Sequence, residues 1–527
     1  MTEIRTRLSG LPEWAFDRRW RIATVIFLVS TTLYRMSQLG SIELAPDEAY
    51  YWDWSRHLAL GYYDQGPFIA YLIKLTTLVF GNTEFGVRFG ALASCFGTLV
   101  CTYVLARRLF SPMTGFIAVL LLGLSPLMEI GSVIATYDPP LVFFWALTVV
   151  WLERALFADK PAERDRAWLI SGVTVGFGFL SKHTMLFILP CIALFLALSP
   201  PHRHWFRRPQ PYLAFGITLA MYSGVLYWNS QHHWWTFGHL LFLAKKTSGT
   251  PIKRFGDLLG SQLGLMGPGL FLAMMIAGFR GLGMTQETAG AQRSRFLACM
   301  GLPVMLLFCV ISLKSKVQAN WPVCAWMSLT ILWAGWATAV SGKSSLSAKK
   351  VFALTAFIAL LSLIPTVGII SPEFRNALGV RLKPEQDTSN TAYGWRQLAR
   401  KVQTLRKEEE KAGRRYFIAG NGYQFCALMA FYLPDHPATF DLYMHNRLDM
   451  YAADVEKLKS HLGEDAIFVD NSAANDPDLK KLFEEVHWEA PYYIWRKPLY
   501  DEPVNTIQIA ICRKYRLYSG LEWADGG

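Results

Sequence analysis

The chain lacks the cysteine patterns of zinc-binding and dithiol redox proteins. Its eight cysteines form no CxxC pair and no zinc-like spacing. Most of them lie in or beside apolar runs, where cysteine usually acts as a small hydrophobic residue. Cys426 and Cys512 instead lie in a polar region, where they could form a disulfide if that region faces an oxidising compartment. We therefore expect no metal centre built from thiolates.

Other patterns are also missing. The sequence contains no nucleotide-binding pattern and no internal repeat of the kind that builds solenoids or transporters with inverted halves. The first apolar run, about 22–39, lacks the small-x-small exit of a cleavable signal and is long enough to cross a bilayer. We therefore expect this run to stay in the protein as a membrane anchor.

Long apolar runs dominate what is present. Hydrophobic residues make up 52% of the 527 residues, above the roughly 45–50% of soluble domains. We predict about eleven membrane spans, several of them shorter than the roughly 20 residues usually needed, at 20–39, 86–106, 112–128, 139–157, 168–180, 183–199, 211–228, 258–279, 296–312, 321–340 and 351–370. The shorter run 67–80 begins at Gly66-Pro67 and carries Lys74, which is typical of a helix at the membrane surface.

The charges between the runs predict how the chain is oriented. Alternate connections are basic, and the positive-inside rule places them in the cytoplasm; they are 18–21, 107–108, 200–211, 280–295 and 343–350. The opposite connections include the acidic segments 40–66 and 129–138. This alternation predicts a cytoplasmic N-terminus and a C-terminal region outside. The formal net charge of +12 therefore indicates topology rather than nucleic-acid binding.

The chain changes character at about Ser371, where it becomes polar and mixed in charge. Periodicity predicts strands within 414–420, 465–470, 492–496 and 506–518, and a helix over 423–433 that Pro434 closes. We therefore predict a polytopic α-helical membrane domain, 1–370, followed by an outer-face α/β domain, 371–527.

Carboxylates and cations collect on the predicted outer face. Acids there could activate an acceptor hydroxyl while cations hold a departing phosphate. The candidates are the acids Asp47, Glu48 and Asp138, and the contacts Lys182, His183, Arg254, Lys314, Lys316 and Asn320. Each has a structural alternative, because a loop acid can be merely solvated, Asp138 can cap a helix, and the aromatic residues 50–54 can form an interfacial belt. Their convergence on one face favours chemistry.

Several motifs together resemble a known family. They are "LAPDEAYYWDWSRHLALGYYDQGPFIAYL", "GNTEFGVRFGALASCFGTLVCTYVLARRLF", "ATYDPPLVFFWAL" and "GFLSKHT". In this order they are similar to the polyprenyl-phosphate-sugar-dependent transferases with the GT-C fold. The resemblance covers most of 20–340 and is strongest to the bacterial lipid A aminoarabinose and galacturonosyl transferases. Protein O-mannosyltransferases are more distant relatives.

The resemblance implies roles at the matching positions. Asp47 matches the catalytic carboxylate, Glu48 accompanies it, and Asp138 matches the acid of the second outer loop. Helices at 47–60 and 67–80 match two surface helices. Together with the outer-face candidates, the predicted substrate-binding residues are Tyr50, Tyr63, Gln65, Lys182, His183, Arg254, Lys314, Lys316 and Asn320.

Gln65 is a departure from the aminoarabinose branch, which has a phosphate-contacting lysine in a Glu-Lys-Pro-Pro sequence. Here the sequence is Asp64-Gln65-Gly66-Pro67. Glutamine donates a hydrogen bond but carries no charge. Phosphate binding would then depend on Lys182, Arg254, Lys314 or Lys316.

We therefore expect an inverting glycosyltransferase that moves a sugar from an undecaprenyl-type polyprenyl phosphate to lipid A, lipopolysaccharide or another envelope glycan. It would act at the periplasmic face of the bacterial inner membrane. The expected partners are the lipid-linked donor, a glycolipid or glycan acceptor and membrane lipid, without nucleic acid. We expect no cofactor, although a divalent metal between carboxylates is compatible with the sequence.

Three alternatives remain open at this stage. A protein O-mannosyltransferase would use a protein acceptor. A flippase or transporter of a lipid-linked sugar would place polar residues in the middle of its spans, whereas here the acids lie at span ends. A non-catalytic receptor would not need Asp47.

Overall fold

The computed structural model describes residues 13–245, 247, 249–284, 288–341, 353, 357–358, 372–377, 379–442, 449–451, 455–471 and 479–516. The predicted span 351–370 lies almost entirely outside these residues. Two compact units are present. We call them the helical unit, which comprises Met1–Gln38, Gln65–Ile69 and Arg88–Val367, and the mixed unit, which comprises Leu39–Asp64, Ala70–Val87 and Gly368–Gly527.

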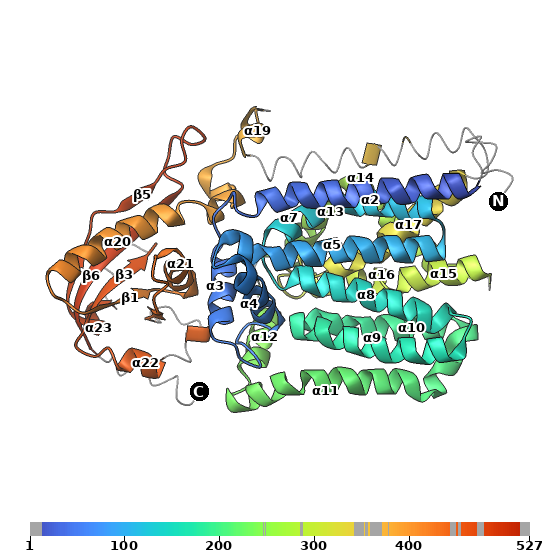
Figure 1. The fold of residues 1–527 in the computed structure, drawn as a ribbon, viewed down its shortest axis with the longest axis horizontal. Helices are drawn as coiled ribbons and strands as arrows, with labels where there is room; N and C mark the ends of the chain where they lie inside the picture. Colours follow the sequence, from blue (N-terminus) through green and yellow to red (C-terminus); the bar gives the residue numbers. More distant parts are fainter. Residues whose placement is uncertain are drawn as a thin grey trace. The chain divides into compact units, whose positions relative to one another are not determined.

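The helical unit contains long, mostly apolar helices. They are α2 (Glu13–Gln38), α5 (Glu84–Leu109), α6 (Pro112–Gly123), α7 (Pro126–Val133), α8 (Asp138–Phe157), α9 (Pro161–Ser181), α10 (Ile188–Leu198), α11 (Pro209–Gln231), α12 (Trp235–Lys245), α13 (Pro251–Met266), α14 (Pro268–Leu282), α15 (Ala289–Cys299), α16 (Leu302–Ser312) and α17 (Trp326–Ser341). Short 3₁₀ segments, η1 (His183–Phe187), η2 (Pro200–Arg207) and η3 (Val323–Ala325), precede three of the helices. Helix α9 packs between α8 and α11, and these helices run alongside one another (Figure 1).

Three segments of the described chain are long and apolar enough to cross a membrane: Glu84–Leu109, Asp138–Phe157 and Ala289–Ser312, the last of which combines α15 and α16. The number rises to five if each of two bent helix pairs counts as one span. Shorter apolar helices occupy other predicted runs, among them His183–Leu198 and Val323–Ala339. The prediction of a largely helical, apolar body is therefore confirmed, whereas the number of about eleven spans stays a prediction.

The predicted span 258–279 is not one straight helix. It is divided into α13 and α14, which meet at 105°. Gly267 separates them with φ 77° and ψ 140°, a conformation that disfavours residues with a Cβ, and Pro268 begins the next helix. The hydropathy of the run could not reveal this bend, because both halves are apolar.

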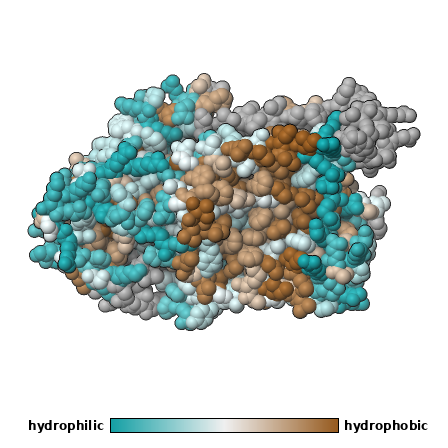
Figure 2. Space-filling model, in the orientation of Figure 1, coloured by the Kyte–Doolittle hydropathy of each residue, from teal (hydrophilic) through white to brown (hydrophobic). Residues whose placement is uncertain are grey.

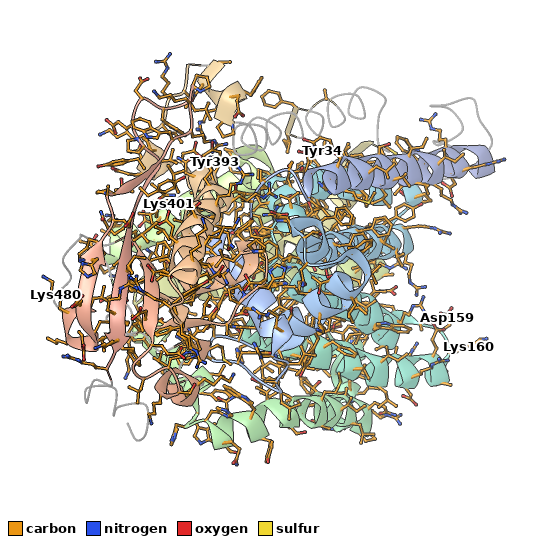
Figure 3. All side chains as sticks on the ribbon, turned by 60° about the vertical axis from the view of Figure 1, so that its left-hand side comes forward. Tyr34, Asp159, Lys160, Tyr393, Lys401 and Lys480 are labelled. Carbon is orange, nitrogen blue, oxygen red and sulfur yellow. The ribbon has the colours of Figure 1, made fainter. Side chains whose placement is uncertain are left out.

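The surface of the helical unit matches a lipid environment. Large hydrophobic side chains remain exposed on it, including Leu272 at 57% and Val310 at 58%. Figure 2 shows a broad band of hydrophobic residues over the helices. Charged residues gather at helix ends, as at the turn between α8 and α9, where Asp159 and Lys160 lie (Figure 3). An apolar belt bounded by polar ends is what a bilayer requires.

The mixed unit combines two early helices with a C-terminal sheet domain. Helix α3 (Pro46–Arg56) and most of α4 (Phe68–Phe80) belong to it, so both predicted surface helices exist as helices. The C-terminal part adds α19 (Pro372–Ala377), α20 (Trp395–Lys411), α21 (Tyr423–Tyr432), α22 (Val455–Lys459) and α23 (Leu479–Leu482), with short 3₁₀ turns η4 (Pro384–Gln386) and η5 (Thr388–Ala392). Helix α3 packs against α21, where the rings of Trp52 and Phe431 form a T-shaped pair with centroids 4.9 Å apart.

The sheet has the strand order β2-β1-β3-β6-β4. Its strands are β1 (Tyr416–Gly420), β2 (Thr439–Asp441), β3 (Asp465–Asp470), β4 (Phe483–Trp488) and β6 (Asn505–Tyr515), and β5 (Tyr492–Ile494) pairs with β6. β1 is parallel to β2 and β3, whereas β6 is antiparallel to its neighbours. The four predicted strands and the predicted helix are confirmed. β2, β4 and α20 were not predicted, and Cys426 and Cys512 are both buried free thiols.

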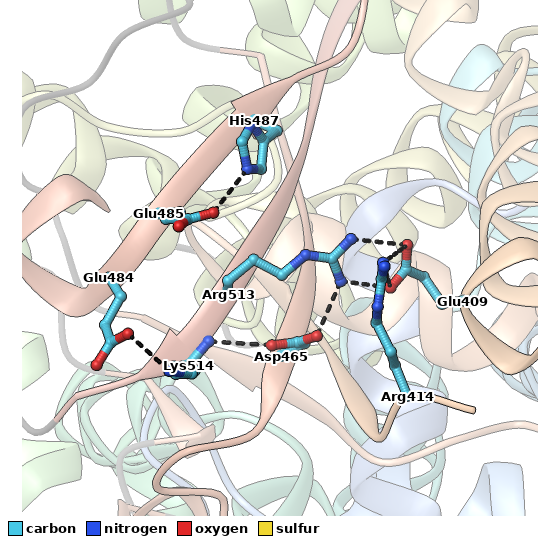
Figure 4. Close-up of polar contacts among 8 residues, drawn as sticks. All are labelled: Glu409, Arg414, Asp465, Glu484, Glu485, His487, Arg513 and Lys514. Carbon is cyan, nitrogen blue, oxygen red and sulfur yellow. Dashed lines mark hydrogen bonds and ion pairs between the residues drawn. The ribbon is translucent and has the colours of Figure 1, made fainter. Parts of the chain in front are cut away.

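Ion pairs fasten α20 to the sheet (Figure 4). Arg513 on β6 donates to Glu409 of α20, with Nη2 3.0 Å from Oε1, and to Asp465 of β3, with Nη1 2.8 Å from Oδ2. The Arg513 guanidinium holds the pKa of Glu409 below its ordinary value. Charge-assisted hydrogen bonds of this kind are stronger than neutral ones, so this contact fixes the helix on the sheet.

Candidate active site

Asp138 lies at the centre of a polar cluster in the helical unit. It is in the first turn of α8, where a carboxylate is favoured by the helix dipole. Its Oδ1 lies 2.7 Å from Nζ of Lys182, and its Oδ2 accepts a hydrogen bond from Nδ2 of Asn320 at 2.6 Å. Three residues that the sequence placed on one face, Asp138, Lys182 and Asn320, are thus in contact.

The charge of Lys182 is neutralised within this cluster. Only 3% of the residue is exposed, and its ammonium group also lies over the ring of Tyr137, 4.8 Å from the centroid. A buried ammonium needs such a partner, because its desolvation costs several kcal/mol, on the order of the ion-pair energy. In this conformation Lys182 binds Asp138, so a phosphate would have to compete with that carboxylate.

A second contact joins Gln65 to His183. Oε1 of Gln65 lies 3.0 Å from Nδ1 of His183, and Nε2 of the same ring lies 2.6 Å from the hydroxyl of Tyr222. Gly66 makes this approach possible, since a Cβ there would lie 2.1 Å from the carbonyl oxygen of Leu180. The Gln65 departure from the aminoarabinose branch therefore has a defined structural partner.

Arg254 is held by carbonyl groups instead of carboxylates. Its guanidinium donates to the carbonyl oxygens of Gly249, Ser312 and Leu313 at 2.7, 3.2 and 2.7 Å. Within the described chain no carboxylate pairs with it at ion-pair distance, so its positive charge is not neutralised. Arg254 lies on α13 and is 8% exposed, and its contacts with Ser312 and Leu313 hold its positive charge at the C-terminal end of α16.

Lys314 and Lys316 follow α16 directly and are both exposed. Neither forms an ion pair with another described residue. Together with Arg254 they place three positive charges around one helix end. Such a group of cations can attract an anionic phosphate.

A cavity of about 220 Å³ in the helical unit lies beside Asp138 and Asn320. Its walls are mostly apolar, with Cys95, Met128 and Leu265 among them. Asp138, Asn320 and Thr136 provide its polar lining. A mostly apolar cavity with a few polar groups at one part is the usual form of a small-molecule or lipid-binding site.

Asp47 and Glu48 lie side by side in the first turn of α3 in the mixed unit, but their surroundings differ. Asp47 is exposed, and its Oδ1 accepts a hydrogen bond from the hydroxyl of Tyr423 at 2.8 Å. Glu48 is fully buried, and its Oε2 accepts the backbone N–H of Ala45 at 2.9 Å. The geometry of Glu48 is that of the acid in a capping box, which stabilises a helix start. Of the two carboxylates, Asp47 is therefore the accessible one.

The aromatic residues after Glu48 are not an exposed platform or belt. Tyr50, Tyr51, Trp52 and Trp54 are each no more than 5% exposed. The hydroxyl of Tyr50 accepts the N–H of Met450 at 2.8 Å, and its ring lies 4.4 Å from that of Tyr423. The interpretation of this cluster as an interfacial belt is wrong, because the rings form the packing of α3 inside the mixed unit.

Tyr63 and Glu129 also have structural surroundings. Tyr63 is 9% exposed, and its backbone N–H points to Sδ of Met450 at 3.1 Å. Glu129 was expected in an outer loop, but it is buried on α7 and pairs with Arg35 of α2 at 2.8 Å. The binding role predicted for Tyr63 stays a prediction.

Two acids that the sequence did not single out meet in the mixed unit. Asp449 is 1% exposed, and its carboxyl group shares a hydrogen bond with that of Asp441. Burial and the neighbouring negative charge raise the pKa of Asp449 well above its ordinary value. The described residues contain no group of three or more His, Cys, Asp or Glu side chains arranged to hold a metal ion.

Sequence reasoning missed Tyr423 and Tyr222 as partners of candidate residues. Both lie in helices that were predicted correctly, so hydropathy and periodicity did not distinguish them from core residues. Tyr423 follows two glycines in "GNGYQF", which was the one available signal of a special turn.

Comparisons of the sequence with known proteins agree with the resemblance. Residues 64–228 match the family described as dolichyl-phosphate-mannose-protein mannosyltransferase. The lipid A galacturonosyltransferase RgtD of Rhizobium johnstonii is 30% identical over 313 residues, which are 58% of this chain and 64% of RgtD. An undecaprenyl phosphate-alpha-4-amino-4-deoxy-L-arabinose arabinosyl transferase of Pseudomonas aeruginosa is 32% identical over 177 residues, 33% of this chain and 31% of that enzyme. The chain thus matches less than two thirds of the length of either curated relative.

The fold is that of a solved membrane protein. The crystal structure of ArnT from Cupriavidus metallidurans in the apo state has a TM-score of 0.62 at 14% identity, and the match covers 92% of this chain and 97% of ArnT. The same protein bound to undecaprenyl phosphate gives a TM-score of 0.61 at 15% identity, with the same coverage. The chain therefore has an ArnT-like GT-C membrane fold with a C-terminal sheet domain, and the predicted resemblance is confirmed.

Proposed function

We propose that this protein is a glycosyltransferase that moves a sugar from a polyprenyl phosphate of the undecaprenyl type to an acceptor in the bacterial envelope. The observation that carries the proposal is the similarity to two enzymes named as lipid A galacturonosyl and undecaprenyl-phosphate aminoarabinose transferases. Both names describe the transfer of a sugar. The proposed acceptor is lipid A or a related envelope glycan.

The site residues suit a single displacement. In the proposed step, the Asp47 carboxylate accepts the proton of an acceptor hydroxyl as the hydroxyl oxygen bonds to the anomeric carbon. The bond from that carbon to the phosphate oxygen breaks at the same time, and polyprenyl phosphate leaves with its electron pair. Attack opposite the leaving group inverts the anomeric configuration. No redox partner or further substrate is needed.

The cations of the helical unit are proposed to hold the donor. Arg254, Lys314 and Lys316 would stabilise the charge that develops on the departing phosphate. Asp138, fixed between Lys182 and Asn320, would orient the polar end of the donor beside the cavity. Any divalent ion would have to bind between carboxylates, and the mechanism assigns it no step.

The membrane arrangement is part of the proposal. About eleven spans, with the N-terminus in the cytoplasm, would place the sheet domain and Asp47 in the periplasm. Helix α4 supports a surface position, because Leu75, Leu78 and Val79 are 62–71% exposed on it. Exposed leucine and valine side chains on one short helix suit the interface between headgroups and acyl chains.

The family match over 64–228 favours a second candidate, transfer of the sugar to a protein hydroxyl. The chemistry of Asp47 would be the same, and only the acceptor would differ. A single assay separates the two, because the labelled product is a lipid in one case and a protein in the other.

The test compares membranes that carry equal amounts of wild type, Asp47→Asn and the control Asp159→Asn. Asp159 is exposed at the turn between α8 and α9, remote in sequence from every candidate residue. Radiolabelled polyprenyl-phosphate sugars are added, and both free polyprenyl phosphate and labelled acceptor are measured. We expect wild type and Asp159→Asn to release lipid phosphate and label a glycolipid. Asp47→Asn should lower the rates of both phosphate release and labelling by about a hundredfold or more.

Other results would contradict the proposal in distinct ways. A labelled protein in place of a labelled lipid would assign the second candidate. Label that only crosses the bilayer, with no release of lipid phosphate, would identify a flippase. Full activity of Asp47→Asn would exclude Asp47 as the base.

A further inference from the structure

Tyr423 brings a hydroxyl group from the C-terminal sheet domain to the proposed base. It is the first residue of α21, and its Oη donates to Oδ1 of Asp47 at 2.8 Å. The two residues are 376 positions apart in the chain. Both belong to the mixed unit. The contact is therefore a product of folding within that unit.

The turn that presents Tyr423 is anchored on both sides. The backbone N–H of Gly422 donates to Oδ1 of Asp441 at 3.0 Å, and Nδ2 of Asn421 donates to Oδ2 of Asp470 at 3.1 Å. Gly422 has φ 95°, which a residue with a Cβ rarely adopts. The turn at the end of β1 is thus tied to the ends of β2 and β3, which leaves the start of α21 little freedom.

The ring of Tyr423 is fixed as well. It is 9% exposed and lies 4.4 Å from the ring of Tyr50, whose hydroxyl is bound by the backbone of Met450. Helix α21 is also packed on α3, the helix that carries Asp47. The Tyr423 hydroxyl is consequently held from its own helix and from the facing one.

Asp47 needs such a hydrogen-bond partner because Asp47 is exposed. An exposed carboxylate samples several rotamers, and only some of them point an oxygen at a reacting hydroxyl. The Tyr423 hydroxyl, which donates a hydrogen bond to Oδ1, favours one of these Asp47 rotamers. Each carboxylate oxygen has two lone pairs, so Asp47 can accept from Tyr423 and from an acceptor hydroxyl at once.

We propose that Tyr423 is a positioning residue for Asp47, so that the C-terminal sheet domain takes part in the transfer reaction through this hydrogen bond. The inference rests on the proposed function, because it assigns Tyr423 a role only if Asp47 is the base. It goes beyond that function by assigning the domain a chemical task in addition to any role in binding. Misplacement of a general base by a fraction of an ångström lowers turnover without removing substrate contacts.

The mixed unit offers a matched control. Tyr451 donates to Oδ2 of Asp53 at 2.6 Å, and Tyr451 is 6% exposed. Both tyrosines are buried and both hydroxyls donate to an aspartate of the same helix, α3, although Asp53 is less exposed than Asp47. Asp53 also pairs with Arg56 at 3.0 Å, so it keeps a partner when the tyrosine hydroxyl is removed.

The experiment compares wild type, Tyr423→Phe, Tyr451→Phe, Asp47→Asn and the double variant Asp47→Asn/Tyr423→Phe, each as the full chain in membranes or detergent. Phenylalanine keeps the ring packing and removes only the hydroxyl. We expect Tyr423→Phe to lower kcat roughly ten- to a hundredfold while the KM for the lipid-linked donor changes about twofold or less. Tyr451→Phe should keep wild-type kcat.

Two further readouts separate positioning from general damage. Loss of the Tyr423 hydroxyl should move the acidic limb of the kcat/KM profile to higher pH, because a hydrogen bond to a carboxylate favours its ionised form. The double variant should be no slower than Asp47→Asn alone, since Tyr423 acts through Asp47. Equal melting temperatures of Tyr423→Phe and Tyr451→Phe confirm that both variants fold.

The outcomes are distinguishable. If wild type is active and Tyr423→Phe keeps both its kcat and its pH profile, the inference is wrong and the proposed function stands. If Tyr451→Phe is impaired as much as Tyr423→Phe, the effect is structural and the inference is again wrong. If wild type neither releases lipid phosphate nor labels an acceptor, the proposed function fails and takes the inference with it.

Discussion

Asp138 and Lys182 form a buried ion pair, and Asn320 binds the second carboxylate oxygen. An ion pair of this kind is a poor source of stability by itself, because both charges have lost their hydration. Removing one partner is more costly, since it leaves the other charge buried without compensation. The pair is therefore better understood as a device that fixes the direction of the Asp138 carboxylate.

A double-mutant cycle tests this interpretation. We expect Lys182→Met and Asp138→Asn each to lower the free energy of unfolding by about 3–5 kcal/mol, and the double variant to lose less than the sum. The measurement is thermal unfolding of the purified full chain in detergent. Additive losses would show that the two side chains do not interact in the folded protein.

The raised pKa of Asp449 makes a second prediction at the scale of a residue. An acid whose pKa is higher in the folded state stabilises the protein only below its ordinary value, about 4, and this contribution is lost as the pH rises toward its folded value. Burial beside Asp441 places Asp449 in this class. We expect Asp449→Asn to raise the Tm at pH 7–8 relative to wild type and to have less effect at pH 4.

Thermal unfolding between pH 4 and pH 8 checks the Asp449 prediction. Asp501→Asn is the control, because Asp501 is exposed in the same unit. We expect that control to leave the pH dependence of wild type unchanged. A lower Tm of Asp449→Asn than of wild type at pH 8 would contradict the prediction that the Asp449 carboxyl destabilises the folded protein at this pH.

At the scale of elements, the bend between α13 and α14 is set by one residue. Gly267 has φ 77°, and Pro268 follows it, so the backbone turns where the hydropathy continues. We expect Gly267→Ala to lower the free energy of unfolding by about 1–3 kcal/mol, the usual cost of forcing a Cβ into such a conformation. Thermal unfolding in detergent measures it.

Gly264→Ala is the control within the same helix. A Cβ at Gly264 would meet nothing within 4 Å, and alanine is favoured over glycine in a helix interior by about 0.5–1 kcal/mol. This variant should be as stable as wild type or slightly more so. Equal destabilisation by both substitutions would show that the positive φ of Gly267 is not the cause of the loss.

At the scale of the whole molecule, the proposed topology places Asp159 and Lys480, both marked in Figure 3, on opposite faces of the membrane. Asp159 lies between α8 and α9, and Lys480 lies in α23 of the sheet domain; both are exposed. We expect a membrane-impermeant maleimide to label Lys480→Cys from the periplasmic side. Asp159→Cys should react only after the membrane is opened.

The native cysteines favour this test. Seven of the eight are buried and Cys309 is half-buried, so unmodified protein should give a low background. Detergent-solubilised samples of both variants supply the control for intrinsic reactivity. Labelling of both positions from the same side would contradict the proposed topology.

The sequence alone determined the helical membrane character, the C-terminal α/β region and most of the candidate residues. These properties depend on local composition and on charge alternation, which each short segment carries by itself. The motif around Asp47 and the pair Lys182-His183 were likewise visible, because the residues that form each motif are neighbours in the chain. For the same reason Gln65 stood out as a departure.

Only the tertiary structure decided which of these residues have partners. It buried Glu48 as a helix cap, neutralised Lys182 with Asp138, and brought Tyr423 to Asp47. Each of the two pairwise contacts joins positions at least 44 residues apart, and no periodicity records such a distance. Composition predicts where a segment can lie, whereas packing determines which polar groups meet, because a buried donor or acceptor must find its partner wherever the fold places one.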